Sequence, residues 1–262
     1  MKLQASRHFA NVVSSETRQL NTICTMLHLF AQTALLNPEP KPWRVNYDTT
    51  SGANVDVLSP GIEYIYGISR PTANALLKIY KLSQCLAYHK ETGYPEGLLQ
   101  ACEDLGDELS SWSVTTERFS AIDHDQVSML KVACAQSKAF HHAALIYYYR
   151  SIQQCAREDL HMEQQAVLAA MSEAETLKKD APADVAMPAP ITWPAFIASC
   201  EAVGDERKGW REWWRQVQRY QMANYARQQD IIARTWQAMD NSQGFCDWRE
   251  TLVSLGIRVL PV

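Results

Sequence analysis

The stretch Ile191-Thr192-Trp193-Pro194-Ala195-Phe196-Ile197-Ala198-Ser199-Cys200-Glu201-Ala202 decides the fold of this chain. From Trp193 onward its residues are almost all apolar or small, which predicts a short helix inside the core. Trp193 and Phe196 would be its large anchors, and Ser199 is small enough to let another helix approach closely. One carboxylate, Glu201, stands among these apolar neighbours and needs a partner if it is buried.

The preferred partner for Glu201 is Arg150, which ends the aromatic block Ala143-Ala144-Leu145-Ile146-Tyr147-Tyr148-Tyr149-Arg150. Each of the two is a charge set among apolar residues, and a buried charge without a partner costs several kcal/mol. We therefore expect an ion pair between them. The alternative is that Glu201 lines an effector pocket.

Outward from this stretch, apolar residues recur at spacings of three, four and seven, which is typical of amphipathic helices. Helices are expected over residues 6–36, 69–91, 95–112, 205–223 and 225–241, with a final one of about ten residues after Gly244. A long helical stretch is expected from Asp123 or Asp125 to about Lys179, with a break near 157–161. Alternation of the strand type is short everywhere, and 258–261 is the only weak strand candidate.

Several helix ends can be read from single residues. Ser69 is a favourable N-cap and lies two positions before Pro71, which suits the first helical turn. Prolines after residue 36 end the first helix, and the segment 180–190, rich in Ala and Pro, is the best candidate for a flexible linker. The prediction is one all-α domain over residues 1–262, an irregular bundle of about ten helices.

The composition favours some classes of protein and disfavours others. With only 10 Gly in 262 residues, an all-β fold with many tight turns is disfavoured. The formal net charge of −4 gives no electrostatic support for nucleic-acid binding by the whole surface. No signal-peptide pattern and no membrane-length apolar run occurs, so we expect a soluble, intracellular protein without a membrane partner.

The 7 cysteines are scattered, without any CxxC pair. This spacing excludes a zinc cluster and fits buried thiols in a reducing compartment. Neither a metal site nor a cofactor is predicted.

A basic helix face is predicted between residues 205 and 223. Arginines recur there at every fourth position, on one slowly drifting face: Arg207, Arg211, Arg215 and Arg219. With Trp210 and Trp214 on a neighbouring face, they could contact phosphates and bases. The favoured alternative pairs them with Glu206, Glu212 or acids of the next helix, while the tryptophans anchor the core, because the chain is acidic overall.

The remaining polar clusters are interpreted as structural or solvated. His141 and His142 are adjacent and point about 100° apart on a helix, so they cannot share a metal by themselves. His124, between two aspartates, fits a helix start. Four acids form a helix face turned to water: Glu103, Asp104, Asp107 and Glu108. No phosphate-binding loop or hydrolase motif occurs, so no catalytic residue is assigned.

Four blocks in order resemble the fungal-specific transcription factor domain, the helical regulatory region found downstream of six-cysteine zinc clusters in fungal activators. They are residues 62–71, 143–150, 191–202 and 247–261. In the third block Ser199 stands where many family members have Gly, so a small residue is kept. The zinc cluster itself has no counterpart in these residues.

The resemblance implies a regulator of transcription in a fungus, nuclear or cytoplasmic, that serves a specialised-metabolite gene cluster. The domain would bind a small apolar metabolite and would form a homodimer or pair with a DNA-binding regulator. Direct sequence-specific DNA binding is not expected. The candidate pocket residues are Trp193, Phe196, Glu201, Tyr147, Arg150 and Trp248.

Two alternatives remain open at this point. A helical regulatory domain can be repurposed as a cofactor-free cyclase or isomerase, which needs a shaped apolar cavity and a few polar groups rather than a named motif. The chain could also be a truncated regulator.

Overall fold

The computed structural model of the chain describes residues 15–34, 40, 61–119, 127–182, 185, 187–242 and 247–262. Over these residues it forms ten α-helices and no strand, which confirms the predicted all-α class for the described part. The helices are α1 (Ser15–Ala34), α2 (Ile62–Tyr66), α3 (Arg70–His89), α4 (Leu98–Ser110), α5 (Val127–Tyr148), α6 (His161–Lys179), α7 (Trp193–Glu201), α8 (Glu206–Val217), α9 (Ala223–Asp240) and α10 (Trp248–Ser254).

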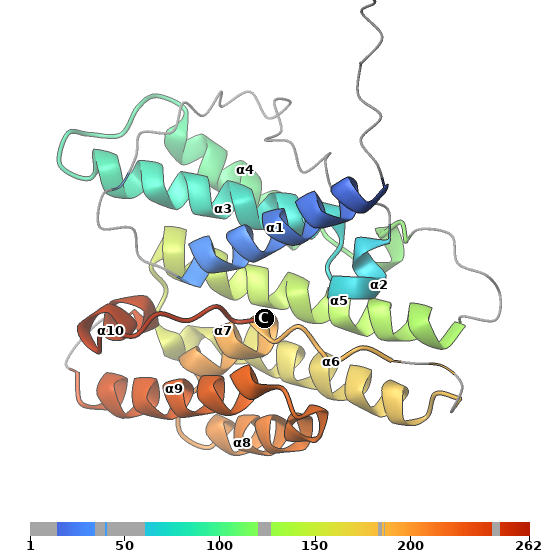
Figure 1. Cartoon of the computed structure of the whole chain (residues 1–262). Coiled ribbons are helices and arrows are strands. Elements are labelled where there is room, and N and C mark those ends of the chain that lie inside the picture. The colour runs from blue at the N-terminus through green and yellow to red at the C-terminus, as the bar shows by residue number, and fades with distance from the viewer. Residues whose placement is uncertain are drawn as a thin grey trace, which may run out of the picture.

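The helices lie in three layers (Figure 1). Helices α1, α3 and α4 form one outer layer, and α8 with α9 forms the other. Between them, α5 and α6 pack along each other, and α7 contacts α5, α6 and α9. Among the described helices, none is both long enough and apolar enough to cross a membrane.

Helix α7 is the centre of the core, as its sequence predicts. All nine of its residues are buried, from Trp193 to Glu201. A helix with apolar residues all round must be covered on every side. Pro194 lies in its first turn, where a proline is tolerated because the amide there has no intrahelical partner.

Ser199 shows how a small residue serves close packing. The indole nitrogen of Trp214 donates to the Ser199 hydroxyl at 2.9 Å, and that of Trp236 donates to its carbonyl at 2.6 Å. The indoles from α8 and α9 therefore reach the α7 backbone at one position. Glycine would permit the same approach but would leave the buried Trp214 N–H without this acceptor.

The predicted start of α3 is confirmed. The Ser69 side chain accepts the Thr72 amide at 3.3 Å, and Pro71 lies in the first turn. The Ser69 hydroxyl also donates to Glu117 at 2.7 Å, so the N-cap ties α3 to the segment that follows α4.

The long helical stretch breaks slightly earlier than predicted. Helix α5 continues into a π-helical turn, Tyr149–Gln153, and Gln154 then takes a left-handed φ of 53°. A 3₁₀ turn, Arg157–Leu160, leads into α6. The reversal at Gln154 lets α6 fold back along α5, whereas the predicted site at 157–161 is already helical again.

Two further expectations need correction, and one short helix was not predicted. Residues 258–261 form no strand, because none of the described segments pairs with them. The helix expected over 205–223 is α8 followed by a 3₁₀ turn, and it ends where Gln221 takes a left-handed φ of 53°. The short helix α2, between Gly61 and Gly67, was not predicted as a helix; both glycines have left-handed φ angles.

The buried-thiol interpretation of the cysteines holds in part. Cys85, Cys102 and Cys200 are buried, but Cys24 is exposed on α1. Cys246 lies outside the described residues, as do His124, Gly244, most of residues 35–60 and part of the 180–190 segment. The flexible linker and the single domain over 1–262 therefore stay predictions.

Candidate functional site

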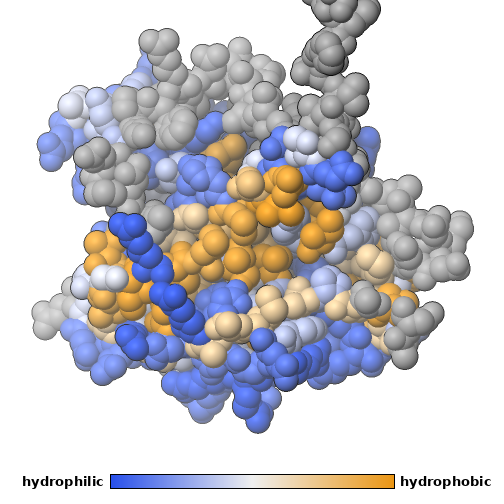
Figure 2. Space-filling view, in the orientation of Figure 1, coloured by the Kyte–Doolittle hydropathy of each residue, from blue (hydrophilic) through white to orange (hydrophobic). Residues whose placement is uncertain are grey.

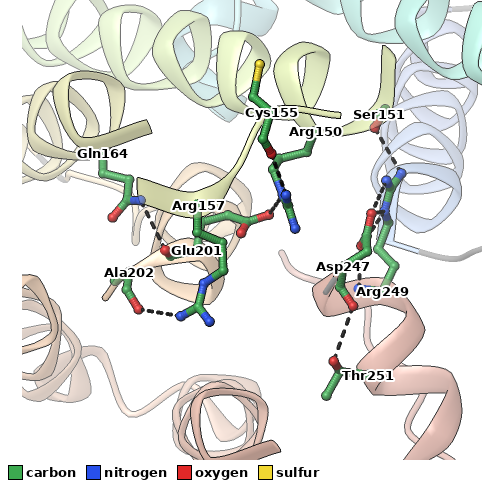
Figure 3. Close-up of polar contacts among 10 residues, drawn as sticks. All are labelled: Arg150, Ser151, Cys155, Arg157, Gln164, Glu201, Ala202, Asp247, Arg249 and Thr251. Carbon is green, nitrogen blue, oxygen red and sulfur yellow. Dashed lines mark hydrogen bonds and ion pairs between the residues drawn. The ribbon is translucent and has the colours of Figure 1, made fainter. Parts of the chain in front are cut away.

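The candidate site lies at the C-terminal end of α7, where a charged side chain enters the core. Arg150 Nε donates to Glu201 Oε1 at 2.6 Å, and both side chains are almost completely buried. The predicted ion pair is therefore confirmed. Arg150 belongs to the π-helical turn after α5, and its Nη1 also donates to the Cys155 carbonyl at 2.6 Å (Figure 3). Turns of this kind are rare and often occur at functional sites.

The Glu201 carboxylate is only partly satisfied. Its second oxygen, Oε2, is buried and has no hydrogen-bond partner among the described residues. Burial raises the pKa of Glu201 to about 7. The negative charge of Asp247 also raises this pKa, whereas the positive charge of Arg150 lowers it. A carboxyl with a pKa near neutrality can be found in either protonation state at the pH of a cell.

Arginine and glutamine side chains cap the end of α7. Gln164 Nε2 donates to the Glu201 carbonyl at 3.1 Å. Arg157 and Arg207 both donate to the Ala202 carbonyl, at 3.1 and 3.0 Å. The last carbonyls of a helix have no intrahelical donor, and positive charge is favourable there. We call Glu201, Arg150, Arg157 and Gln164 the Glu201 cluster.

A second ion pair lies beside this cluster, at the start of α10. Arg249 Nη2 and Asp247 Oδ2 are 2.5 Å apart, and Arg249 Nη1 donates to the Ser151 hydroxyl at 2.9 Å (Figure 3). Burial alone would raise the pKa of Asp247, but the charge and hydrogen bonds of Arg249 hold this pKa below its usual value. The Arg249 guanidinium lies over the Tyr147 ring, 5.4 Å from its centroid.

The six candidate pocket residues meet as three pairs along α7. Arg150 contacts Glu201 at one end. The Phe196 and Trp248 rings are edge to face, with centroids 5.6 Å apart, and the Tyr147 and Trp193 rings are arranged likewise at 6.4 Å. All six residues are at most 2% exposed. The six side chains pack inside the core along α7, and their role as a ligand pocket stays a prediction.

The aromatic end of α7 is packed differently from its charged end. Trp193 stacks on Phe140 from α5, with ring planes 2° apart, and on Phe30 from α1. Its indole nitrogen donates to Thr33 Oγ1 at 2.7 Å. Aromatic contacts of this kind join three helices without any charge, so this end of α7 is a packing anchor.

Sequence reasoning missed a further buried carboxylate, Glu175 on α6. Its Oε1 accepts from Lys178 at 2.8 Å, and its Oε2 accepts from Arg219 and from the Tyr220 hydroxyl, each at 2.7 Å. We call these four residues the Glu175 cluster. In the sequence, Glu175 and Lys178 resemble a solvated pair three residues apart on a helix surface, so no signal marked them as buried.

The arginines of the basic face predicted on α8 mainly form ion pairs, which was the favoured interpretation of the sequence. Both Nη atoms of Arg207 donate to the carboxylate of Asp240 on the next helix, each at 2.6 Å. Arg215 pairs with Glu212. Trp210 and Trp214 are buried in the core as predicted. Arg219 instead reaches back to α6, and Glu206 pairs with His161 rather than with an arginine.

His141 and the acidic face of α4 take the roles expected of them. His141 is buried and stacks on Trp112, with ring centroids 4.0 Å apart. Burial lowers its pKa to about 3, with a further contribution from His142, so the ring stays neutral. The acidic face of α4 is exposed. In the described part of the chain, no group of three His, Cys, Asp or Glu side chains could hold a metal ion.

Comparison with known proteins identifies one family. A family model described as the fungal-specific transcription factor domain matches residues 3–262. The match includes all four sequence blocks, and it confirms the resemblance read from them. No curated protein and no solved structure matches the chain.

Proposed function

This chain belongs to the family of fungal-specific transcription factor domains, which makes it part of a fungal regulator of transcription, and we propose that it controls a specialised-metabolite gene cluster. The observation that carries the regulatory role is the family match over residues 3–262, which includes the α7 segment at the centre of the core. The specialised-metabolite gene cluster is the finer part of the proposal, and the transcript experiment below tests it. The effector would be a small apolar metabolite, because the candidate residues are mainly aromatic with a few polar groups, a composition that suits such ligands.

We further propose that α7 transmits the state of the domain. It contacts helices of the middle layer and of the α8–α9 layer, so a shift of α7 would displace side chains in both layers. At its charged end, Gln164, Arg157 and Arg207 hold the backbone carbonyls. The Glu201 carboxylate itself has one ion pair and one oxygen without a hydrogen-bond partner among the described residues, which supports a second arrangement of this side chain at modest free-energy cost. An effector would act by favouring one arrangement.

We propose that this regulator reaches DNA through a DNA-binding partner in the nucleus. The 7 cysteines of the given sequence lack zinc-cluster spacing, and the net charge of −4 is unfavourable for a protein that covers DNA by itself. In an anisotropy titration at physiological salt, the purified protein should bind DNA no more tightly than about micromolar and without sequence preference. Nanomolar, sequence-selective binding would contradict the partner proposal.

The regulatory role itself is tested by deleting the gene and measuring transcripts of the neighbouring genes. We expect them to change together, and the wild-type gene should restore them. The matched variants are Glu201→Gln, which alters the charged end of α7, and Lys208→Ala on the surface of α8, which should behave as wild type. If transcripts remain unchanged in the deletion strain, the regulatory role is wrong.

One observation favours a second candidate, a cofactor-free isomerase or cyclase. A buried carboxyl with a pKa of about 7 is suited to general acid–base catalysis. However, the Glu201 side chain has no exposed surface, so a substrate could reach it only after α7 moved. The same deletion experiment separates the two: an enzyme would alter the metabolite profile while leaving the transcripts of its neighbours unchanged.

A further inference from the structure

Helix α10 covers two of the candidate pocket residues. Its Trp248 packs edge to face on Phe196 of α7, and its Arg249 guanidinium lies over the Tyr147 ring of α5. The opposite side of α10 faces outward, where Val253 is 60% exposed. A helix of seven residues is too short to be stable by itself, so these inward contacts hold it in place.

Arg249 connects α10 to the π-helical turn that follows α5. Its Nη1 donates to the Ser151 hydroxyl at 2.9 Å. Its Nε and its backbone amide both donate to Asp247 Oδ1, at 3.0 and 2.7 Å, so the same residue also holds the N-cap of α10. Loss of the Ser151 contact would therefore loosen the start of the helix.

The same π-helical turn also holds Glu201. Arg150 and Ser151 are consecutive residues of this turn, and their side chains point to different segments (Figure 3). Arg150 donates to Glu201 on α7 at 2.6 Å, whereas Ser151 accepts from Arg249 on α10. Successive side chains of a helix lie about 100° apart, which lets one turn contact both segments. A movement of this turn would therefore act on both ion pairs.

Glu201 and the start of α10 also interact electrostatically. The charged and titratable groups that act on Glu201 or respond to it come from several elements: Arg150, Arg157, Cys200, Asp247 and Arg249. From α8, Arg207 donates to the neighbouring Ala202 carbonyl. The negative charge of Asp247 raises the pKa of Glu201, and the positive charge of Arg150 lowers that of Asp247. The two ion pairs are therefore close enough to affect each other.

Burial decides the direction of this coupling, because it is the main cause of the raised pKa of Glu201. If α10 moved away, Asp247 and Arg249 would leave together, so the loss of their charges would largely cancel. The water that entered would lower the pKa of Glu201. Opening of α10 would therefore release the proton of Glu201, and by linkage α10 should open more readily as the pH rises through 7.

We propose that α10 is a movable cover over the candidate pocket residues, latched by Arg249 on Ser151 and coupled through the π-helical turn to the Glu201–Arg150 pair. Its opening would uncover the Tyr147 and Phe196 rings, an aromatic surface that suits an apolar ligand. Apolar surface at α10 continues toward the centre of the face shown in Figure 2, where such a ligand would approach. The opening is a property of the fold, whereas its use for effector entry rests on the proposed function.

The experiment measures hydrogen–deuterium exchange of the purified full chain at about pH 6 and pH 8, corrected for the intrinsic exchange rate. The opening constant of α10 should rise about threefold to tenfold between these pH values in the wild type and should stay constant in Glu201→Gln. Ser151→Ala should raise it about tenfold at both pH values, because the latch is lost. Lys208→Ala, on the surface of α8, should behave as wild type.

Helix α6, in the middle layer, reports unfolding of the whole domain in the same experiment. Exchange of α10 at the rate of α6 would mean that α10 opens only when the domain unfolds, and this overturns the proposal. Exchange of α10 that does not depend on pH, or that changes equally in Glu201→Gln, overturns the coupling to Glu201.

A second measurement tests whether the uncovered surface accepts an apolar ligand. The probe is the fluorescent dye 8-anilinonaphthalene-1-sulfonate, which should bind Ser151→Ala at least about threefold more tightly than the wild type, with an unchanged near-ultraviolet circular dichroism spectrum. Faster exchange of α10 without tighter dye binding would show that the cover opens but does not serve ligand entry. Neither measurement uses transcripts, so a failure of the regulatory role is seen separately, in the deletion strain.

Discussion

Glu201 and Glu175 are both completely buried carboxylates, yet their surroundings differ. Glu175 accepts from three donors, Lys178, Arg219 and Tyr220, so both of its oxygens are satisfied. Glu201 accepts from Arg150 at one oxygen, while its other oxygen has no hydrogen-bond partner in the described part of the chain. Two equally buried carboxylates can therefore be held with different strength. The number of hydrogen-bond donors to the carboxylate oxygens decides how firmly the charge is held.

The two clusters also differ in what they connect. The Glu175 cluster ties the end of α6 to the 3₁₀ turn after α8, Gln218–Tyr220, near the edge of the molecule, where Arg219 is partly exposed. Burial raises the pKa of Tyr220 to about 12, so its hydroxyl keeps the proton that it donates to Glu175. The Glu201 cluster joins α5, α6 and α7 at the centre. Protonation or a small helix shift therefore has more consequence at Glu201.

The largest difference should appear when the arginine of each cluster is removed. At about pH 8, Arg150→Met should destabilise the fold by about 3–5 kcal/mol, because Glu201 must then be buried without its cation or take up a proton, and the Cys155 carbonyl loses its donor as well. Arg219→Met should cost only about 1–2 kcal/mol, because Lys178 and Tyr220 still donate to Glu175. Urea unfolding of both variants measures this, and equal losses would show that the donor count is not the cause.

A smaller effect should be seen in the coupling between Arg150 and Glu201. Glu201→Gln removes the carboxylate that accepts from Arg150 Nε, so each single variant should be destabilised, while the double variant should lose about 1–3 kcal/mol less than the sum. The four proteins of a double-mutant cycle give this value. Strict additivity would mean that the two side chains do not interact in solution and would return Glu201 to the candidate acid–base groups.

The raised pKa of Glu201 predicts a specific pH dependence. Because this pKa is about 7 in the fold and near 4.5 when unfolded, Glu201 favours the folded state below about pH 4.5, and this contribution is lost as the pH rises through 7. Between about pH 5 and 8, the stability of the wild type should fall by roughly 2 kcal/mol relative to Glu201→Gln.

Asp247 provides the control of opposite sign. Its folded pKa is lowered, so the wild type should lose stability relative to Asp247→Asn only as the pH falls below about 4. A flat difference between the wild type and Glu201→Gln over the neutral range would show that Glu201 does not titrate there.

The smallest effect is expected outside both clusters. Lys208 pairs with Asp205 at 2.8 Å on the surface of α8, with both side chains largely exposed. Lys208→Ala should change stability by less than about 0.5 kcal/mol, because water and salt screen such pairs. A loss comparable to that of Arg219→Met would mean that exposure does not separate the surface pairs from the buried clusters.

The sequence by itself determined the all-α class, the buried helix α7 and the pairing of Glu201 with Arg150. These follow from local rules: apolar residues on every face of a helix require burial, and a charge among them requires an opposite charge. The Ser69 N-cap is of the same kind, since the capping hydrogen bond spans only three residues. The family resemblance was also readable from four blocks, and the family match confirms it.

The tertiary structure alone decided which carboxylates are satisfied. Glu175 and Lys178 resemble a surface pair in sequence, and only the approach of Arg219, 44 positions away, encloses them. The reversal at Gln154, the 3₁₀ turn after α8 and the exposure of Cys24 likewise depend on where neighbouring helices end. The physical reason is that periodicity identifies the apolar face of a helix, whereas burial of a polar side chain depends on contacts between segments distant in sequence.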